Sequence, residues 1–385
     1  MNFDRTLLAL IVSQVGLHGA MAGLRMAAPL DALREGASPW RVGVLLALFA
    51  AAPVLLALPA GRMADRWGFH RPMRLAAAVT GLGMLAALVS TLLPGAGHGL
   101  GLALGAVAAG AGANIGMIAI QRTGGLVARD AVQRVRVFSW LAIAPSVGNM
   151  IGPVLAGGLI DLGGFRTAYA ALLLMPLASV SAARAVPAGA ASPATAPAVG
   201  SALGLLALPG MKRLLVVNWL LSMCWDVHAF AVPILGHGHG FSATVIGLVL
   251  GSFTLSVTGV RLVIPGLAER LRPEVVIPGA MALTAGVFAV YPFASAPLAM
   301  AACAVVLGLA LGCVQPMMMS VLHHLTPHDR HGQALAFRSM TINGSSTLMP
   351  LLFGAGGALL GASALFWLAG SMVGAGSALA RRLRT

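Results

Sequence analysis

The sequence predicts an all-α membrane protein in which twelve transmembrane helices form two pseudo-symmetric bundles of six. Three observations support this fold class: the composition, the succession of long apolar runs and an internal repeat. Of the 385 residues, 58% are hydrophobic and only 9% are charged. In soluble domains roughly a quarter of the residues are charged, so this composition excludes an ordinary soluble protein.

Apolar runs follow one another along the chain, separated by short polar segments. A membrane helix needs roughly 20 apolar residues to cross a hydrocarbon core about 30 Å thick. By this criterion the predicted spans cover residues 7–30, 41–60, 72–93, 98–121, 137–160, 165–187, 213–236, 243–265, 275–294, 297–322, 334–360 and 362–380. The first run is longer than the apolar region of a secretory signal, so we expect it to be a permanent helix. The separations at Gly95 to Gly97 and at Gly361 depend on small residues alone.

The charges indicate how the chain is oriented in the membrane. The formal net charge is +14, which in a soluble protein would suggest a nucleic-acid partner. With the N-terminus in the cytoplasm, about 20 of the 24 Lys and Arg residues, Arg338 among them, fall at cytoplasmic ends of the predicted spans. We therefore expect a multi-pass protein of the cytoplasmic (inner) membrane, with both termini in the cytoplasm and no nucleic-acid partner.

A segment rich in Ala, Pro, Ser and Gly, residues 185–204, separates the sixth predicted span from the seventh. It has no charge and no helical period, which is typical of a flexible linker. We expect an N-terminal bundle over residues 1–187, a cytoplasmic linker over 188–208 and a C-terminal bundle over 209–385.

The two halves repeat each other at a constant offset, which takes Gln14 to Asn218. Matches of Ala, Leu and Gly arise by chance in such a composition, so the informative matches are the polar, proline and charged ones. Besides the Gln/Asn pair these are Pro29 with Pro233, and ADR at 64–66 with AER at 268–270. Many transporters are assembled from such repeats, with substrate sites near the bilayer midplane where the repeats meet.

The segment GRMADRWGFHRP, residues 61–72, concentrates charge between two apolar runs. It resembles the signature loop between helices two and three of the major facilitator superfamily (MFS), a pattern close to GxLaDRxGRK. The residues in register are Gly61, Asp65, Arg66 and Gly68. Phe69 and His70 stand where the family usually has basic residues, which leaves Arg71 as the next cation. The resemblance, with the span count, linker and repeat, implies the MFS fold.

In the family this loop is thought to stabilise the outward-open state. The resemblance implies such a conformational latch for Asp65, Arg66 and Arg71, and the repeat extends it to Glu269 and Arg270. A carboxylate at the end of a span can pair with cations and with the positive end of a helix dipole. The alternative is that these charges only anchor a turn at the membrane surface.

Polar residues within the spans form two stripes. Their members are Gln14, His18 and Arg25 in the first span, and Asn218, Ser222 and Asp226 in the seventh. In the first stripe the spacings of four and seven residues place the side chains within about 40° of one another around a helix. In the second stripe every fourth residue is polar. We expect both stripes to line a substrate cavity.

Asp226 is the only acidic residue that we place deep within a span, because Asp31 and Asp161 fall near outer ends. A charge there costs roughly 3 kcal/mol even on the insertion scale, so it is expected to face a cavity. A partly buried carboxylate also takes up a proton more readily than a solvated one. Asp226 is therefore the candidate for proton coupling or for holding a cationic substrate; a permanent ion pair with Arg25 is the alternative. His18 is a second candidate proton carrier, with packing between helices as its alternative.

Four further residues are candidates for the cavity. They are Trp225, Asn114, Gln315 and Asn343. The amides have an alternative role in bridging helices, which is common in membranes. The His-rich segment 323–331 has no clean ligand spacing, so we expect a solvated loop rather than a metal site. We expect no cofactor, and no disulfide either, because all three cysteines fall inside spans.

The fifth span contains GNMIGPVLAGG, residues 148–158. Small residues allow helices to approach closely, and proline removes a backbone donor. The run is similar to the antiporter motif of the superfamily through Gly148, Gly152, Pro153, Gly157 and Gly158, although three residues rather than two separate its GP and GG pairs. That motif accompanies export driven by proton entry. An arginine that many drug–proton antiporters have in span four is replaced by Ala106.

Two functions follow as hypotheses. The first is proton-coupled efflux of small amphiphilic or cationic organic molecules by alternating access. The second is proton-coupled uptake of a small organic anion, with Arg25 binding its carboxylate. An enzyme is not expected, because no nucleophile, base and orienting group fall at matched depth. The expected partners are a small-molecule substrate, protons and the bilayer, and we expect a monomer.

Overall fold

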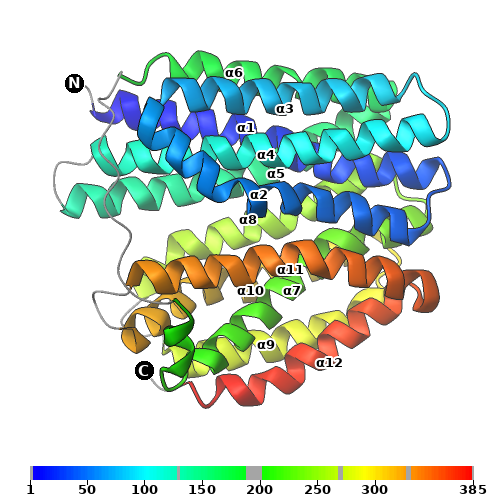
Figure 1. Cartoon of the computed structure of the whole chain (residues 1–385). Coiled ribbons are helices and arrows are strands. Elements are labelled where there is room, and N and C mark those ends of the chain that lie inside the picture. The colour runs from blue at the N-terminus through cyan, green and yellow to red at the C-terminus, as the bar shows by residue number, and fades with distance from the viewer. Residues whose placement is uncertain (1–2, 128–130, 188–201, 268–271, 327–330, 384–385) are drawn as a thin grey trace. The chain divides into compact units, whose positions relative to one another are not determined.

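The computed structural model describes residues 3–127, 131–187, 202–267, 272–326 and 331–383, which contain helices and no strand (Figure 1). The α-helices are α1 (Phe3–Arg34), α2 (Pro39–Trp67), α3 (His70–Ser90), α4 (Ala96–Val127), α5 (Ala131–Leu172), α6 (Leu174–Ala183), α7 (Met211–Gly238), α8 (Ala243–Leu267), α9 (Pro273–Val290), α10 (Pro297–Leu325), α11 (His331–Leu360) and α12 (Ala362–Ala380). Two 3-10 helices, η1 (Ala202–Ala207) and η2 (Tyr291–Phe293), complete the described elements. Each predicted span corresponds to a helical segment, so the all-α membrane fold is confirmed.

Ten stretches of the described residues are long and apolar enough to cross a membrane. One of them, Ile143–Ala183, contains most of the two predicted spans 137–160 and 165–187, because α5 and α6 follow each other almost without a break. The chain turns at Gly164, whose φ of 76° and ψ of 179° are not helical. Only glycine adopts this backbone conformation without strain. The turns predicted from small residues near Gly95 and Gly361 are also present, since α4 and α12 begin directly after them.

Two compact units make up the structure. Unit 1 comprises Met1–Ala37, Val44–Thr195 and Phe241–Gly251, and unit 2 comprises Ser38–Gly43, Ala196–Gly240 and Ser252–Thr385. Most of the predicted linker, residues 188–201, lies outside the described residues, so its flexibility stays a prediction. Its last part forms η1.

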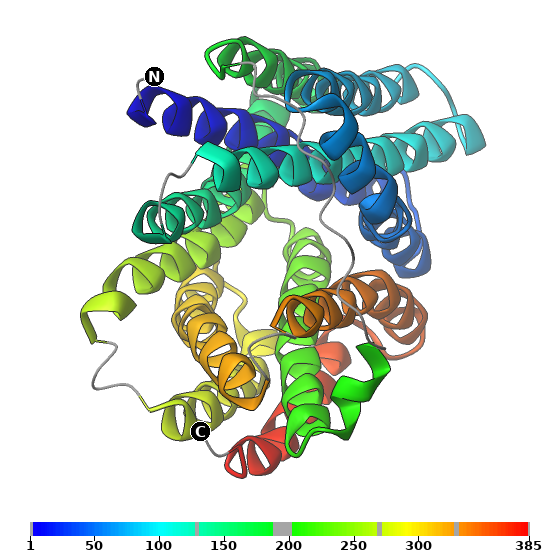
Figure 2. The same ribbon diagram turned by 60° about the vertical axis from the view of Figure 1, so that its left-hand side comes forward.

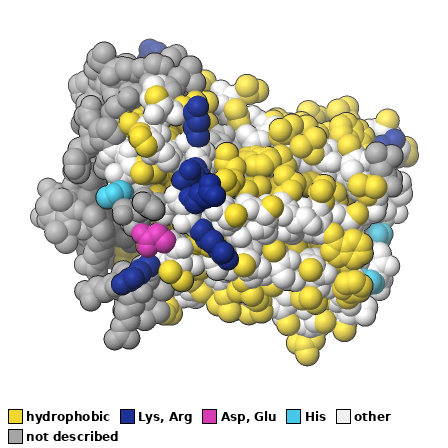
Figure 3. Space-filling model, turned by 90° about the horizontal axis from the view of Figure 1, so that it is seen from below, with side chains coloured by type: hydrophobic (Ala, Val, Ile, Leu, Met, Phe, Trp, Pro, Cys, Tyr) yellow, Lys and Arg dark blue, Asp and Glu magenta, His cyan; other side chains and the backbone are white. Residues whose placement is uncertain are grey.

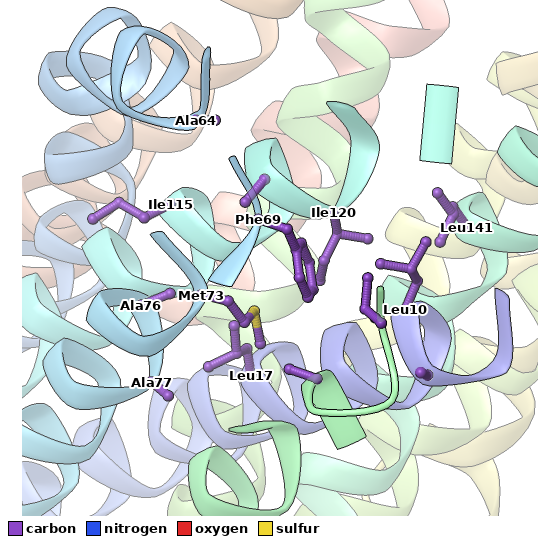
Figure 4. Close-up of a cluster of buried hydrophobic side chains, with 14 of the residues drawn as sticks. Leu10, Leu17, Ala64, Phe69, Met73, Ala76, Ala77, Ile115, Ile120 and Leu141 are labelled. Carbon is purple, nitrogen blue, oxygen red and sulfur yellow. The ribbon is translucent and has the colours of Figure 1, made fainter. Parts of the chain in front are cut away.

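Unit 1 is held together mainly by α1, which packs against α4, α5 and α6, and by the pair of α3 and α4 (Figures 1 and 2). A buried cluster of this unit draws apolar side chains from α1 to α6 (Figure 4). The Phe69 ring lies among Met73, Ile120 and Leu10 in this cluster, and only 4% of it is exposed. Burial of this ring explains why an aromatic residue stands where the signature loop of the superfamily has a basic one.

In unit 2, α7 packs against α11 and α12, and α9 packs against α10 and α12 (Figure 2). Many large apolar side chains remain exposed, among them Leu298, Leu309 and Leu368. Figure 3 shows one face on which many hydrophobic side chains lie to the right of a band of Lys and Arg side chains. An exposed apolar surface flanked by cations is typical of a helix bundle in a bilayer.

Candidate functional site

The second polar stripe joins α7 to α10 and α11 through an arginine. Arg338 of α11 donates from Nε to the side-chain oxygen of Asn218, 3.0 Å away, and from a terminal nitrogen to the side-chain oxygen of Gln315. The structure therefore brings two of the predicted cavity residues together. The sequence counted Arg338 as a cytoplasmic end charge, whereas its side chain is half-buried between three helices. Its position inside the predicted span 334–360 was the signal for this.

Asp226 forms a second polar layer with α11. Its two carboxylate oxygens accept hydrogen bonds from the hydroxyls of Ser345 and Ser346, at 2.9 and 3.0 Å. The carboxylate is buried, with 4% of the residue exposed. Eight residues separate Asn218 from Asp226 on α7, which places the two layers about 12 Å apart along the helix. The sequence did not single out the two serines, because hydroxyls are common at helix contacts.

The remaining predicted residues of unit 2 lie in different environments. Ser222 is buried between the two layers along α7. Trp225 is half-buried, with its ring 4.8 Å from the ring of Phe253 in an edge-to-face arrangement. The guanidinium of Arg261 in α8 lies over the same Trp225 ring, 6.0 Å from its centre. Asn343 is exposed, and no side-chain contact to the stripe is seen for it among the described residues.

The first stripe lies on α1 in unit 1. Gln14 is only 2% exposed, and both atoms of its amide lack a hydrogen-bond partner among the described residues. His18 and Arg25 are half-buried and close enough for the charge of Arg25 to act on the imidazole. Asn114 of α4 is half-buried too, and its amide nitrogen has no described partner. Because Arg25 and Asp226 belong to different units, the predicted pair between them stays a prediction.

A buried polar group that the sequence did not predict lies near the C-terminal end of α1. Asp31 is 5% exposed and accepts a hydrogen bond from the hydroxyl of Tyr169 at 2.9 Å. Its second oxygen lies 3.5 Å from Nε2 of His98, which is also buried. The sequence placed Asp31 near an outer end, which is correct along the helix but missed its burial. The chain has two tyrosines, and their rarity was the signal that could have pointed to this polar group.

The other ring nitrogen of His98 binds the backbone at the end of α3. Nδ1 lies 2.9 Å from the carbonyl oxygen of Ser90. A carbonyl only accepts, so Nδ1 donates in this contact. Asp31, His98 and Tyr169 thus form a compact buried polar group between α1, α4 and α5.

The described residues include only part of the predicted conformational latch. Gly68 has a φ of +68° at the turn between α2 and α3, which accounts for the glycine of the signature pattern. Arg66 and Arg71 are exposed on either side of this turn. The side chain of Asp65, and Glu269 and Arg270 altogether, lie outside the described residues. A methyl group added at Gly61 would meet no atom within 4 Å.

The antiporter-like run of α5 lies against α1. A methyl group on Gly148 would meet the backbone nitrogen of Gly19 at 2.9 Å, and one on Gly152 would meet its carbonyl oxygen at 2.3 Å. Farther along the run, a methyl group on Gly157 would lie 2.4 Å from the carbonyl oxygen of Ala243 in α8. Gly158 has open space instead.

Pro153 contributes to the contact between α5 and α8 within unit 1. Its carbonyl oxygen would lie 2.5 Å from a methyl group on Gly247. Nearby, the carboxylate of Asp161 accepts hydrogen bonds from the backbone nitrogens of Ala243 and Thr244, at 3.1 and 2.7 Å. Asp161 therefore satisfies backbone donors in the first turn of α8.

Long apolar helices joined by sparse buried polar contacts are typical of a multi-pass integral membrane protein. The model of the Major Facilitator Superfamily matches residues 10–211 and 214–385, which is nearly the whole chain. The chain therefore belongs to the Major Facilitator Superfamily, a family of membrane transporters rather than enzymes.

Similar proteins include exporters. The enterobactin exporter EntS of Salmonella choleraesuis (strain SC-B67) is 25% identical over 279 residues, which cover 70% of this chain and 66% of that protein. EntS of Escherichia coli O1:K1 / APEC is 25% identical over 257 residues, or 65% of this chain and 61% of that protein. The chain thus spans just under two thirds of the length of the curated relatives that it matches.

Solved structures share the fold at low identity. A POT family transporter in complex with a thioalcohol conjugated peptide has a TM-score of 0.77 at 13% identity, and the likeness covers 97% of this chain and 95% of that one. The human organic anion transporter MFSD10 (TETRAN) has a TM-score of 0.66 at 17% identity, covering 99% and 100%. At such identities the likeness concerns the fold alone.

Proposed function

We propose that the chain is a proton-coupled exporter of small amphiphilic organic molecules and that Asp226 carries the proton. The observation that carries this proposal is the hydrogen bonding of Asp226, whose two oxygens accept from Ser345 and Ser346 in a buried site. An ionisable group in this position is costly and is usually retained for function.

Protonation of Asp226 changes its contact with α11. A carboxylate only accepts hydrogen bonds, whereas a carboxylic acid donates one. Once Asp226 is protonated, the oxygen that carries the proton becomes a donor, and the serine bound to it can accept that hydrogen in place of donating its own. Proton binding and release therefore alter how α7 is bound to α11, which is the property that a coupled transporter needs. This change of contact at Asp226 needs no arginine in α4, where many drug–proton antiporters have one and this chain has the fully buried Ala106.

The direction of transport is inferred from two sources. The antiporter-like run of α5 accompanies export in the superfamily, and the relatives at 25% identity are named as exporters. The charge distribution supports a place in the inner membrane with both termini in the cytoplasm. Every residue in the proposal belongs to one chain, so a monomer suffices. Proton-driven uptake of an organic anion is the second candidate, and the arginine Arg338 is the observation that favours an anion.

Everted membrane vesicles test the proposal with two probes of opposite charge, ethidium and benzenesulfonate. Adding the transported probe to acidified vesicles is expected to dissipate the pH gradient while the probe accumulates. Asp226→Asn is expected to abolish this coupling and to retain exchange of labelled for unlabelled probe. Asp161→Asn, which removes an exposed carboxylate of α5 near the turn at Gly164, is the control. Unchanged coupling in Asp226→Asn would refute the role of Asp226, and influx into intact cells would reverse the direction.

A further inference from the structure

We propose that Arg213 and Arg382, with Lys212 and Arg381 next to them in the sequence, form a binding site for one anionic phospholipid. This inference goes beyond the proposed function and does not depend on it. Lys212 and Arg213 lie in the first turn of α7, and Arg381 and Arg382 directly follow α12. The two helices pack against each other in unit 2 (Figure 2).

A hydrogen bond joins the two helix ends. Nη1 of Arg213 donates to the backbone carbonyl oxygen of Arg382 at 2.7 Å. The last carbonyl groups of a helix have no partner within it and attract cations. This contact uses one of the five N–H donors of the guanidinium, and the others have no partner among the described residues. The contact also holds the Arg213 cation beside a backbone position that carries a second arginine.

The four cations have no neutralising partner in the part of the chain that the structure describes. None of them forms an ion pair with a described carboxylate. Arg213 is half-buried, and the other three are exposed. Capping of α12 accounts for one cation at this place, and the positive-inside rule accounts for the side of the membrane. Neither accounts for four cations at two adjoining helix ends, where like charges repel one another and an anion relieves the repulsion.

Exposed apolar side chains continue from the cations toward the middle of the helices. Val216 on α7 and Leu379 on α12 are each about one turn away from the cations, and both are exposed. On α12, Met372 and Leu368 follow Leu379 at spacings of seven and four residues and are exposed as well. Such spacings place side chains on one face of a helix. An apolar strip roughly 16 Å long therefore leads away from the arginines on α12.

The chemistry of this surface selects a phospholipid. Guanidinium groups bind phosphate oxygens through paired N–H donors. Anionic lipids of the cytoplasmic leaflet are attracted to cations next to a membrane helix, and we expect these helix ends on the cytoplasmic side. A lipid matches both parts of the surface, because its phosphate meets the arginines while an acyl chain covers the apolar strip. A soluble phosphate matches only the cations.

Native mass spectrometry of the purified full-length chain in detergent tests the site by titration with single lipids. We expect dioleoylphosphatidylglycerol to bind more tightly than dioleoylphosphatidylcholine, which has the same acyl chains and no net charge. A cation near the headgroups contributes a factor of about five in affinity. Arg213→Gln and Arg382→Gln are therefore each expected to weaken binding of the first phosphatidylglycerol about fivefold. Arg74→Gln, at an exposed arginine of α3 in unit 1, is the matched control and is expected to bind like the parent chain.

The two arginine variants separate charge from helix contact. Arg382→Gln removes a charge but keeps the hydrogen bond between the helices, because that bond is accepted by a backbone carbonyl. It therefore keeps the test decisive if Arg213→Gln loses stability. Equal affinity for the two lipids, or a loss in Arg74→Gln as large as that in Arg382→Gln, would show that no site exists at these helix ends.

Glycerol phosphate distinguishes a lipid from a soluble anion. We expect phosphatidylglycerol to raise the melting temperature of the parent chain and glycerol phosphate to leave it unchanged. Equal shifts would overturn the assignment to a lipid. Neither measurement involves transport, so a negative result leaves the proposed proton role of Asp226 untouched.

Discussion

One added methyl group at Gly152 tests how closely α5 approaches α1. A side-chain carbon at this position would lie 2.3 Å from the carbonyl oxygen of Gly19 and 2.7 Å from the backbone nitrogen of Gly23. Real contacts of this kind are essentially never shorter than 3.0 Å. The two backbones therefore have to separate by at least about 0.7 Å, because neither neighbour is a flexible side chain.

Overpacking of this kind costs about 1 to 3 kcal/mol, and we expect Gly152→Ala to lower the free energy of unfolding by about that amount. Gly158→Ala is the matched control in the same run, because its added carbon meets nothing within 4 Å. In the control, the higher helix propensity of alanine is expected to leave stability unchanged or raised by up to about 1 kcal/mol. Unfolding of both variants in mixed micelles, followed by circular dichroism, gives the comparison. Equal stability of the two variants would falsify the close approach of α1 and α5.

Three further predictions concern unit 1. Tyr169→Phe is expected to cost about 1 to 2 kcal/mol in micellar unfolding, because the Asp31 carboxyl loses a buried donor; an unaltered midpoint contradicts this. Phe69→Ala is expected to cost about 3 to 5 kcal/mol by opening a cavity in the core of the unit, and a loss below 1 kcal/mol would place the ring outside that core. Asp161→Ala is expected to increase amide exchange at Ala243 in the first turn of α8, and unchanged exchange would contradict the capping contact.

The fold class followed from the sequence because lipid leaves the backbone few choices. A polar peptide group in hydrocarbon has to be bonded within its own segment, so each apolar run of sufficient length becomes a helix. The residues of the internal repeat, such as Gln14 and Asn218, then mark equivalent positions in two halves. The exact ends were less certain, and the almost continuous path from α5 to α6 depends on the conformation of Gly164, which hydropathy does not report.

The candidate site was predicted in part. Asn218, Gln315 and Asp226 were identified from their polarity within apolar spans, and each has polar contacts in unit 2. Arg338 was misplaced among the end charges, because the positive-inside rule assigns cations to loops without regard to the partners that allow a cation inside a bundle. Tyr169 was overlooked, since a tyrosine in an apolar span resembles any other aromatic packing residue.

The sequence by itself determined the helices, their succession and the polar face of each, because hydropathy and the helical period are properties of one segment. The tertiary structure alone decided which polar faces meet: Arg338 with two amides from α7 and α10, Asp226 with two serines from α11, and Asp31 with Tyr169 and His98. The physical reason is that a helical period fixes the direction of a side chain around its own axis. The neighbour that it reaches depends on how whole helices pack, which is settled by shape complementarity along their full length.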